Sequence, residues 1–131
     1  MRKKLVIPIE IKSRELLPAL YLSKIFLKND WDVYIGQKQQ IFPYIKIFSE
    51  SVFFLKSIVP GEKTLIQKIK RAGHFIATSD PEGLSPNPPG ILSVPSRFSD
   101  ETIELTDIIF FWGKKYYSDF KKIFGSQLKK K

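Results

Sequence analysis

A carboxylate and two cations are spaced two residues apart near the start of the chain, as Glu10, Lys12 and Arg14. If the extended conformation of the preceding apolar segment continued through them, the three side chains would project to one side. A carboxylate and two cations that face one point could clamp an anionic acceptor or a sugar acid. A solvated cluster of ion pairs, with little effect on stability, explains the same residues equally well.

A second candidate site follows the apolar segment 74–79, where the chain reads Asp80-Pro81-Glu82-Gly83. A carboxylate at the mouth of a sheet can act as a general base toward a sugar hydroxyl, and Glu82 is the candidate for that role. The same residues are also ordinary turn composition, in which Gly83 supplies a positive φ. The residues alone favour the turn.

Other candidates follow from the rule that ligands of open α/β sheets bind beyond the carboxyl ends of the strands. The residues that follow the second and fifth predicted strands are Gly36, Lys38, Trp112 and Gly113. Trp112 could stack on a sugar or a base, although a strand-terminal Trp in a Phe-rich sheet is more often part of the core. Strand ends are also polar simply because they meet water.

Strand and helix signals alternate along the chain, and these elements must position the candidates. Apolar segments predict five strands, at residues 5–11, 31–35, 51–56, 74–79 and 107–112. Helical spacing or capping residues predict helices near 15–28, 39–48, 61–71 and 114–124, and a short one that opens at Ser99. Such alternation predicts an α/β fold, an open doubly wound parallel sheet of about five strands that is Rossmann-like.

Several prolines and glycines refine these boundaries. Pro8 cannot donate a ladder hydrogen bond, so the first strand is predicted to bulge there or to pair on one side only. Pro18 predicts that the regular part of its helix begins near Leu16 or Leu17. Gly125 is predicted to end the last helix, which gives one domain over residues 1–125 and a basic tail over 126–131. Residues 80–97 predict a long loop, and His74, at the opposite end of its strand from the site, is interpreted as structural or surface.

Composition narrows the chemistry. The 131 residues include no cysteine, which excludes disulfides, zinc–thiolate sites and thiol catalysis. No dinucleotide fingerprint, Walker loop, nucleophile elbow or metal-ligand cluster is found, so no cofactor and no metal is expected. The net charge of +9 indicates an anionic partner, but no aromatic-basic RNA motif supports nucleic acid.

A membrane surface is another candidate partner. The basic pairs of residues 114–115 and 121–122, the terminal lysines 129–131, and Tyr116, Tyr117 and Phe124 could together form a membrane-surface patch. A solvated helix face followed by a tail is the alternative. No apolar segment approaches the roughly 18 residues that span a bilayer. The expected location is the cytoplasm, peripheral to the inner membrane.

The order of these motifs resembles the N-terminal part of bacterial surface carbohydrate biosynthesis proteins. The motifs are Ile7-Pro8-Ile9-Glu10-Ile11-Lys12-x-Arg14-Glu15, Gly36, Gly73-His74, Asp80-x-Glu82-Gly83-Leu84 and Asp107-x-x-Phe110-Phe111-Trp112-Gly113. The match is collinear over residues 5–124. The family is similar to two-domain glycosyltransferases of the GT-B type, linked to lipopolysaccharide and capsule assembly. Their N-terminal Rossmann-like domain mainly holds the acceptor, and their C-terminal domain binds the nucleotide-sugar donor.

The resemblance implies that Glu10, Lys12, Arg14, Glu82 and Gly83 line a cleft between two domains. It implies an acceptor-side domain of a glycosyltransferase that holds an anionic sugar or lipid-linked glycan, is incomplete without a donor-binding domain, and does not turn over alone. The proline-rich residues 86–95 depart from the family pattern. The alternatives are a non-catalytic binding or scaffold protein for an anionic glycan or membrane surface, and a stand-alone flavodoxin-like or receiver-like domain.

Overall fold

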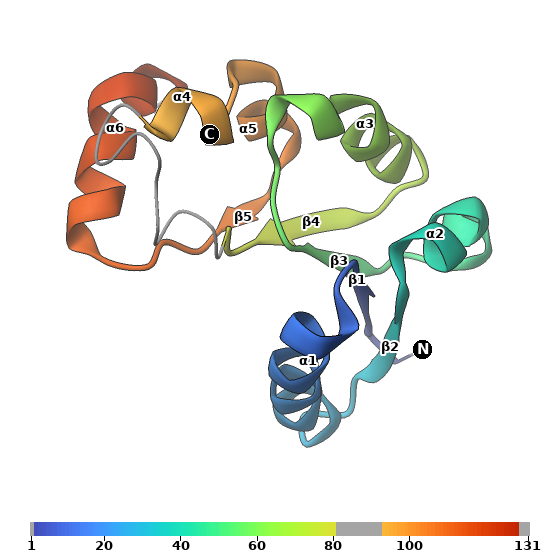
Figure 1. Ribbon diagram of the computed structural model, residues 1–131. Helices are drawn as coiled ribbons and strands as arrows, with labels where there is room; N and C mark the ends of the chain where they lie inside the picture. The colour runs from blue at the N-terminus through green and yellow to red at the C-terminus, as the bar shows by residue number, and fades with distance from the viewer. Residues whose placement is uncertain (1, 81–92, 129–131) are drawn as a thin grey trace.

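The chain is an α/β protein built on one sheet of five parallel strands, seen in a computed structural model that describes residues 2–80 and 93–128 (Figure 1). The strands are β1 (Lys4–Ile9), β2 (Asp32–Gln37), β3 (Val52–Leu55), β4 (Phe75–Thr78) and β5 (Ile108–Ile109). Their order is β2-β1-β3-β4-β5, and every neighbouring pair is parallel. The predicted open parallel sheet of about five strands, of Rossmann-like type, is therefore confirmed.

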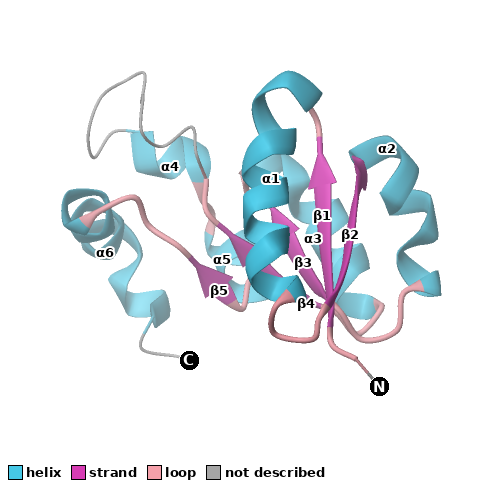
Figure 2. Ribbon diagram, turned by 90° about the horizontal axis from the view of Figure 1, so that it is seen from below, coloured by secondary structure: helices cyan, strands magenta, loops and turns pink. Residues whose placement is uncertain are grey.

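Helices cover the two faces of the sheet unequally. They are α1 (Lys12–Leu27), α2 (Lys38–Ile41), α3 (Lys63–Arg71), α4 (Val94–Arg97), α5 (Asp100–Leu105) and α6 (Lys114–Leu128), with 3-10 turns η1 (Phe42–Ile47) and η2 (Pro60–Glu62). One core, around Leu5, Ile7 and Ile9, is covered by α1. The larger core lies on the other face, under α2, α3, α5 and α6 (Figures 1 and 2).

Pro8 limits the pairing of β1, because proline has no backbone N–H to donate to a neighbouring strand. It lies opposite Gly36 of β2, within a ladder that runs the whole length of β1. On the other side, the pairing of β1 with β3 covers only Leu5 and Val6. The prediction of one-sided pairing at Pro8 is confirmed, because a residue without an N–H can stay in a strand where one neighbour is missing.

The predicted start of the first helix is wrong. Helix α1 begins at Lys12 and carries Pro18 in its interior. The amides of Arg14 and Glu15 both donate to the carbonyl of Ile11, at 3.1 and 2.9 Å, so a turn closes before the proline. The Glu15 carboxylate also accepts the amide of Glu10 at 2.7 Å. Packing of the helix on the sheet outweighs the hydrogen bond that Pro18 cannot donate.

Two other helices follow their sequence signals. In α3, Ile66 and Ile69 are fully buried and Leu65 packs at the edge of the core, while Gly73 has a φ of 85° just beyond the helix. Ser99 caps α5 through a reciprocal pair of hydrogen bonds with Thr102. The Ser99 cap and the glycine that follows α3 both depend on local chemistry, which acts over a few residues and needs no tertiary context.

The end of the chain departs from prediction in two ways. Strand β5 is reduced to Ile108–Ile109, and helix α6 continues through Gly125 to Leu128. A glycine inside a helix costs about 1 kcal/mol relative to alanine. That cost is small beside the packing of Phe120 and Phe124, which precede Gly125 in the same helix and are buried in the larger core. The expected basic tail is therefore helical over its first three residues.

Candidate functional site

The strand order reverses between β1 and β3, and a cavity opens at this point. From β1 the chain passes to β2 at the sheet edge and then returns to β3 on the other side of β1. Open α/β sheets bind their ligands at such a switch point, beyond the carboxyl ends of the strands. The cavity has a volume of about 290 Å³ and lies between α1 and the sheet. We call it the crevice.

The lining of the crevice is apolar on most sides and charged on one. The apolar lining comes from β1, α1, β3 and the segment after β5, and consists of Ile7, Pro8, Ile9, Pro18, Ala19, Leu22, Phe54 and Trp112. Arg14, Glu15 and Lys56 add charged groups, and Ser79 adds a hydroxyl. A mainly apolar hollow with a few convergent polar groups is the usual form of a small-molecule site.

Trp112 is the aromatic residue with the clearest capacity to hold a ligand. Its indole Nε1–H donates to the carbonyl of Asp80 at 3.0 Å, which ties the ring to the end of β4. The side chain nevertheless stays 50% exposed and lines the crevice. The ring is therefore not part of the buried core, and its stacking on a ligand stays a prediction. A ring with a fixed edge and an accessible face can stack on a sugar without first being ordered.

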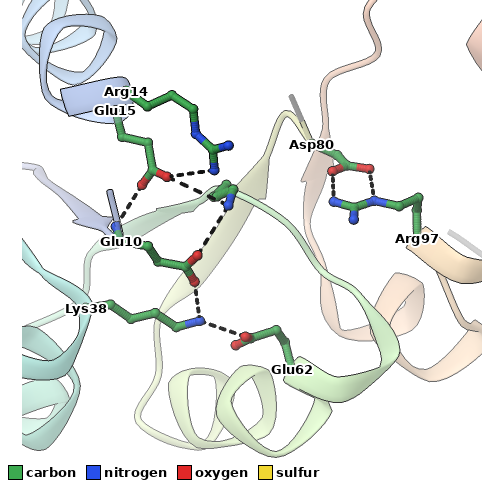
Figure 3. A network of polar contacts seen from close by, with 8 residues as sticks. Glu10, Arg14, Glu15, Lys38, Glu62, Asp80 and Arg97 are labelled. Atoms are coloured by element: carbon green, nitrogen blue, oxygen red, sulfur yellow. Dashed lines mark hydrogen bonds and ion pairs between the residues drawn. The ribbon is translucent and has the colours of Figure 1, made fainter. Parts of the chain in front are cut away.

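Six charged residues at the carboxyl end of β1 form an ionic cluster beside the crevice: Glu10, Arg14, Glu15, Lys38, Lys56 and Glu62 (Figure 3). The Lys38 ammonium lies 2.7 Å from carboxylate oxygens of both Glu10 and Glu62. The Lys56 ammonium bridges Glu10 at 3.3 Å and Glu15 at 3.7 Å. With three acids and three bases the cluster is balanced in charge.

Ion pairing in the cluster shifts two ionisation equilibria. The hydrogen bond from Lys38, helped by Lys56, lowers the pKa of Glu10 although partial burial opposes the charged form. Burial also disfavours the charge on Lys38, but its bonds to Glu10 and Glu62 outweigh that effect and raise the pKa of Lys38. Both groups are therefore held in their charged forms at neutral pH.

The lowered pKa of Glu10 predicts a loss of stability in acid. A carboxylate with a lowered folded-state pKa contributes stability that is complete above its ordinary pKa of about 4.3 and is lost as pH falls through the lowered value. We expect Glu10→Gln to reduce the free energy of unfolding by up to about 1 kcal/mol at neutral pH, and by progressively less below about pH 4. Urea unfolding across pH measures this difference.

Lys38→Met is the matched control for that experiment, because it removes the main cause of the shift and keeps the carboxylate. In Lys38→Met, the substitution Glu10→Gln should have a smaller effect at neutral pH. An effect of Glu10→Gln that is the same at acid and neutral pH would contradict the assignment.

The predicted one-sided clamp of Glu10, Lys12 and Arg14 is not formed. The strand ends at Ile9 and α1 begins at Lys12, so Lys12 and Arg14 lie about 200° apart around a helix. Arg14 lines the crevice and bonds to Glu15 at 3.5 Å, and Glu10 belongs to the cluster. Lys12 is exposed and does not line the crevice. The alternative, a partly solvated group of ion pairs, describes Glu10 and its neighbours better.

The other candidates are placed as follows. Lys38 starts α2 and binds Glu10 across the end of the sheet. Gly36 lies within β2, where a Cβ would approach the side chain of Ile41 to 3.2 Å, so its role here is close packing. Gly113 stands between Trp112 and α6, outside the crevice lining. Glu82 and Gly83 lie outside the described residues, and the roles expected for them stay predictions.

A buried ion pair near Trp112 was not among the expected site residues. Asp80 is 2% exposed and has a φ of 26°. Its carboxylate accepts two hydrogen bonds from the Arg97 guanidinium, one of them from Nε at 2.9 Å, and a longer one from the Tyr116 hydroxyl at 3.4 Å (Figure 3). Burial and the nearby Asp80 charge raise the pKa of Tyr116 to about 12.

This Asp80–Arg97 pair fixes the end of β4 to α4, and the Tyr116 hydroxyl links the same carboxylate to α6. The position of Asp80 after a buried strand was readable from the sequence. Its partner was not, because no periodic pattern runs through the segment between Asp80 and Arg97, which are 17 positions apart. His74 is buried with its Nε2 3.0 Å from the carbonyl of Ile45, which is a structural role.

The fold and the crevice define an open, all-parallel α/β protein with a ligand-sized hollow at its switch point. Comparison with protein-family models, curated proteins and solved structures finds no match to this chain. Within the described ranges, no helix has the length and apolar content needed to cross a membrane. Among the same residues, no group of three or more potential metal ligands is found.

Proposed function

We propose that this chain forms the acceptor-binding side of a glycosyltransferase in surface polysaccharide or lipopolysaccharide biosynthesis. The acceptor glycan would occupy the crevice, with one sugar ring stacked on Trp112. Arg14, Glu15 and Lys56 would hydrogen-bond to its hydroxyl or carboxylate groups. The observation that carries the proposal is the Trp112 ring, held half-exposed by Asp80 at the switch point of the sheet.

Two further features support this proposal. The sheet is of the Rossmann-like type that the family resemblance implies. The sequence also carries no glycine-rich phosphate loop after the first strand, which suits an acceptor better than a nucleotide donor. In this proposal, a donor-binding domain supplies the nucleotide sugar and Glu82 acts as the general base toward the acceptor hydroxyl.

A second candidate function is binding of a neutral glycan without catalysis, and a neutral ligand suits the charge balance of the ionic cluster. Its carboxylates and cations already neutralise one another, with Lys38 and Lys56 each contacting two glutamates. Such a cluster can orient hydroxyl groups but offers little net charge to an anionic sugar. The strand order is also that of flavodoxin-like domains, but Lys12 and Arg14 stand where those would carry a phosphate-binding loop.

The test uses tryptophan fluorescence, since the chain has only two tryptophans. Trp31→Phe leaves Trp112 as the single reporter. We expect saturable quenching by neutral or uronic-acid oligosaccharides and no effect from UDP-glucose. Trp112→Ala, measured by calorimetry, should weaken glycan binding by about tenfold or more, because a stacked aromatic ring contributes on the order of 1 kcal/mol beyond its buried area.

Tyr44→Ala is the matched control, because Tyr44 is 57% exposed on η1 and does not line the crevice. It should bind glycans as the unmodified chain does. Equal affinity in Trp112→Ala would refute the site, and tight binding of UDP-glucose would assign the crevice to a donor instead. Binding with no glycosyl transfer after a donor-binding partner is supplied would favour the second candidate.

A further inference from the structure

Helix α1 carries apolar side chains on both of its faces. Leu16, Ala19, Leu22 and Phe26 face inward and pack on β1, β2 and β3. Leu17, Leu20, Tyr21 and Ile25 face away from the sheet and are 50–67% exposed. We call these four residues the outer face of α1. A helix that is apolar all round is normally covered on both sides, so the outer face indicates a surface that meets another apolar phase.

The position of α1 leaves its outer face accessible. Among the described elements, α1 is the only helix on its side of the sheet (Figures 1 and 2). The other helices pack against the larger core on the opposite side. The outer face therefore has no other described helix over it, and a hollow that is wide open to solvent borders Leu17 and Leu20. Such an open surface suits a broad, soft partner.

The exposed charges that α1 itself carries beside the outer face are basic. Lys24 lies among its apolar residues, Lys28 caps the C-terminal end of the helix, and Lys12 lies at its start. In the described part of the chain, none of these three lysines takes part in a salt bridge. The single acidic residue of α1, Glu15, is 13% exposed in its side chain and faces Lys56. The outer face is thus apolar and basic.

We propose that the outer face of α1 docks on an anionic membrane surface. Leucine, tyrosine and isoleucine side chains would enter the boundary between headgroups and acyl chains, while Lys24 and Lys28 contact lipid phosphates. A symmetric dimer through the same face would bring the lysines of two copies together, and like charges oppose such contacts. Charge complementarity therefore selects the membrane over a second copy.

The alternative membrane patch on α6 loses part of its apolar surface in the structure, although Tyr117 stays 42% exposed. Phe124 is buried, Tyr116 packs at the edge of the larger core, and Lys115 and Lys122 both pair with Asp119. Among the described residues there, Tyr117 and Ile123 are the remaining exposed apolar side chains, fewer and less exposed than the four of the outer face of α1. The inference about α1 does not rest on the proposed glycan function, because it uses no residue that binds sugar in that proposal.

The experiment is flotation of the full chain with vesicles of phosphatidylcholine plus phosphatidylglycerol, and with vesicles of phosphatidylcholine alone. We expect binding to the anionic vesicles only, weakened by salt. Lys24→Gln with Lys28→Gln should lower the partition coefficient by about 25-fold, since each lysine near an anionic surface contributes about fivefold. Leu17→Gln with Leu20→Gln should lower it by at least about tenfold.

The control pair is Lys121→Gln with Lys122→Gln, which removes the same charge from α6 and should change binding little. Circular dichroism verifies folding, and light scattering measures oligomeric state. Three results would each overturn the inference: binding that only the α6 pair abolishes, absence of binding to either vesicle, or a dimer that the leucine pair dissociates. Glycan binding in the leucine pair should be unchanged, which separates this test from that of the crevice.

Discussion

Replacing Arg97 by methionine is expected to lower the free energy of unfolding by about 3–5 kcal/mol, because it leaves a buried carboxylate without its counter-charge. The Asp80 side chain is 3% exposed, and Arg97 meets it with a two-point contact. Asp80 also holds a left-handed φ of 26°, an arrangement that surrounding contacts must maintain. Methionine keeps most of the apolar stem, so the loss isolates the guanidinium.

Urea unfolding measures this change, and Lys63→Met is the matched control. Lys63 pairs with Glu101 at 3.3 Å, with 44% and 56% of the two side chains exposed. An exposed pair of this kind contributes at most about 1 kcal/mol. Adding Asp80→Asn to Arg97→Met should recover part of the loss, because the buried charge is then removed. A loss in Arg97→Met no larger than that in the control would contradict a buried pair.

The same variant bears on the crevice. The Trp112 indole is tied to the backbone carbonyl of Asp80, and Asp80 is held by Arg97. We therefore expect a changed Trp112 emission in Arg97→Met even where the protein is folded. The ion pair acts on the site through Trp112 and does not touch the ligand in the proposed function.

Truncating Phe120 to alanine is the other substitution with a large expected effect. Phe120 is fully buried, and its ring centroid lies 4.9 Å from that of Phe98, 4.8 Å from Phe111 and 5.4 Å from Phe124. Removing a buried phenyl ring costs about 3–5 kcal/mol through lost burial and the cavity that remains. Since a domain is stable by only about 5–15 kcal/mol, the loss should be plain in thermal or urea unfolding.

Ile123→Ala in the same helix is the control, since Ile123 is 37% exposed. Phe120 and Ile123 are three residues apart in α6, yet the structure buries only the first of them. We expect a cost of about 1 kcal/mol or less for Ile123→Ala. Similar costs for the two variants would mean that α6 packs in a different rotation from the one described.

Local chemistry made much of the fold readable. The strands of the sheet are short apolar segments. The Ser99 cap and the glycine Gly73 at the end of α3 depend only on adjacent residues. Pro8 predicted that β1 pairs on one side only at that residue. The errors came where tertiary packing overrode a local rule. Pro18 and Gly125 lie inside helices because the packing of those helices offsets their local cost.

The sequence predicted where the site lies better than it predicted which residues pair there. Because the carboxyl ends of parallel strands share one edge of the sheet, the sequence predicts that Glu10, Arg14, Lys38 and Trp112 lie in one region. The structure places them there. The sequence did not reveal that Glu62 completes the ionic cluster or that Arg97 neutralises Asp80. Such pairings join residues with no regular spacing between them.

The sequence by itself determined the class of sheet, the sheet edge that carries the polar site residues, and the local helix signals. It could do so because strand alternation, capping and turn chemistry act over short ranges. Tertiary structure alone decided the strand order, the crevice and the partner of each charge. It also separated the two apolar faces of α1, because periodicity marks a side chain as apolar but not as covered. Burial depends on which elements the chain brings together over long distances.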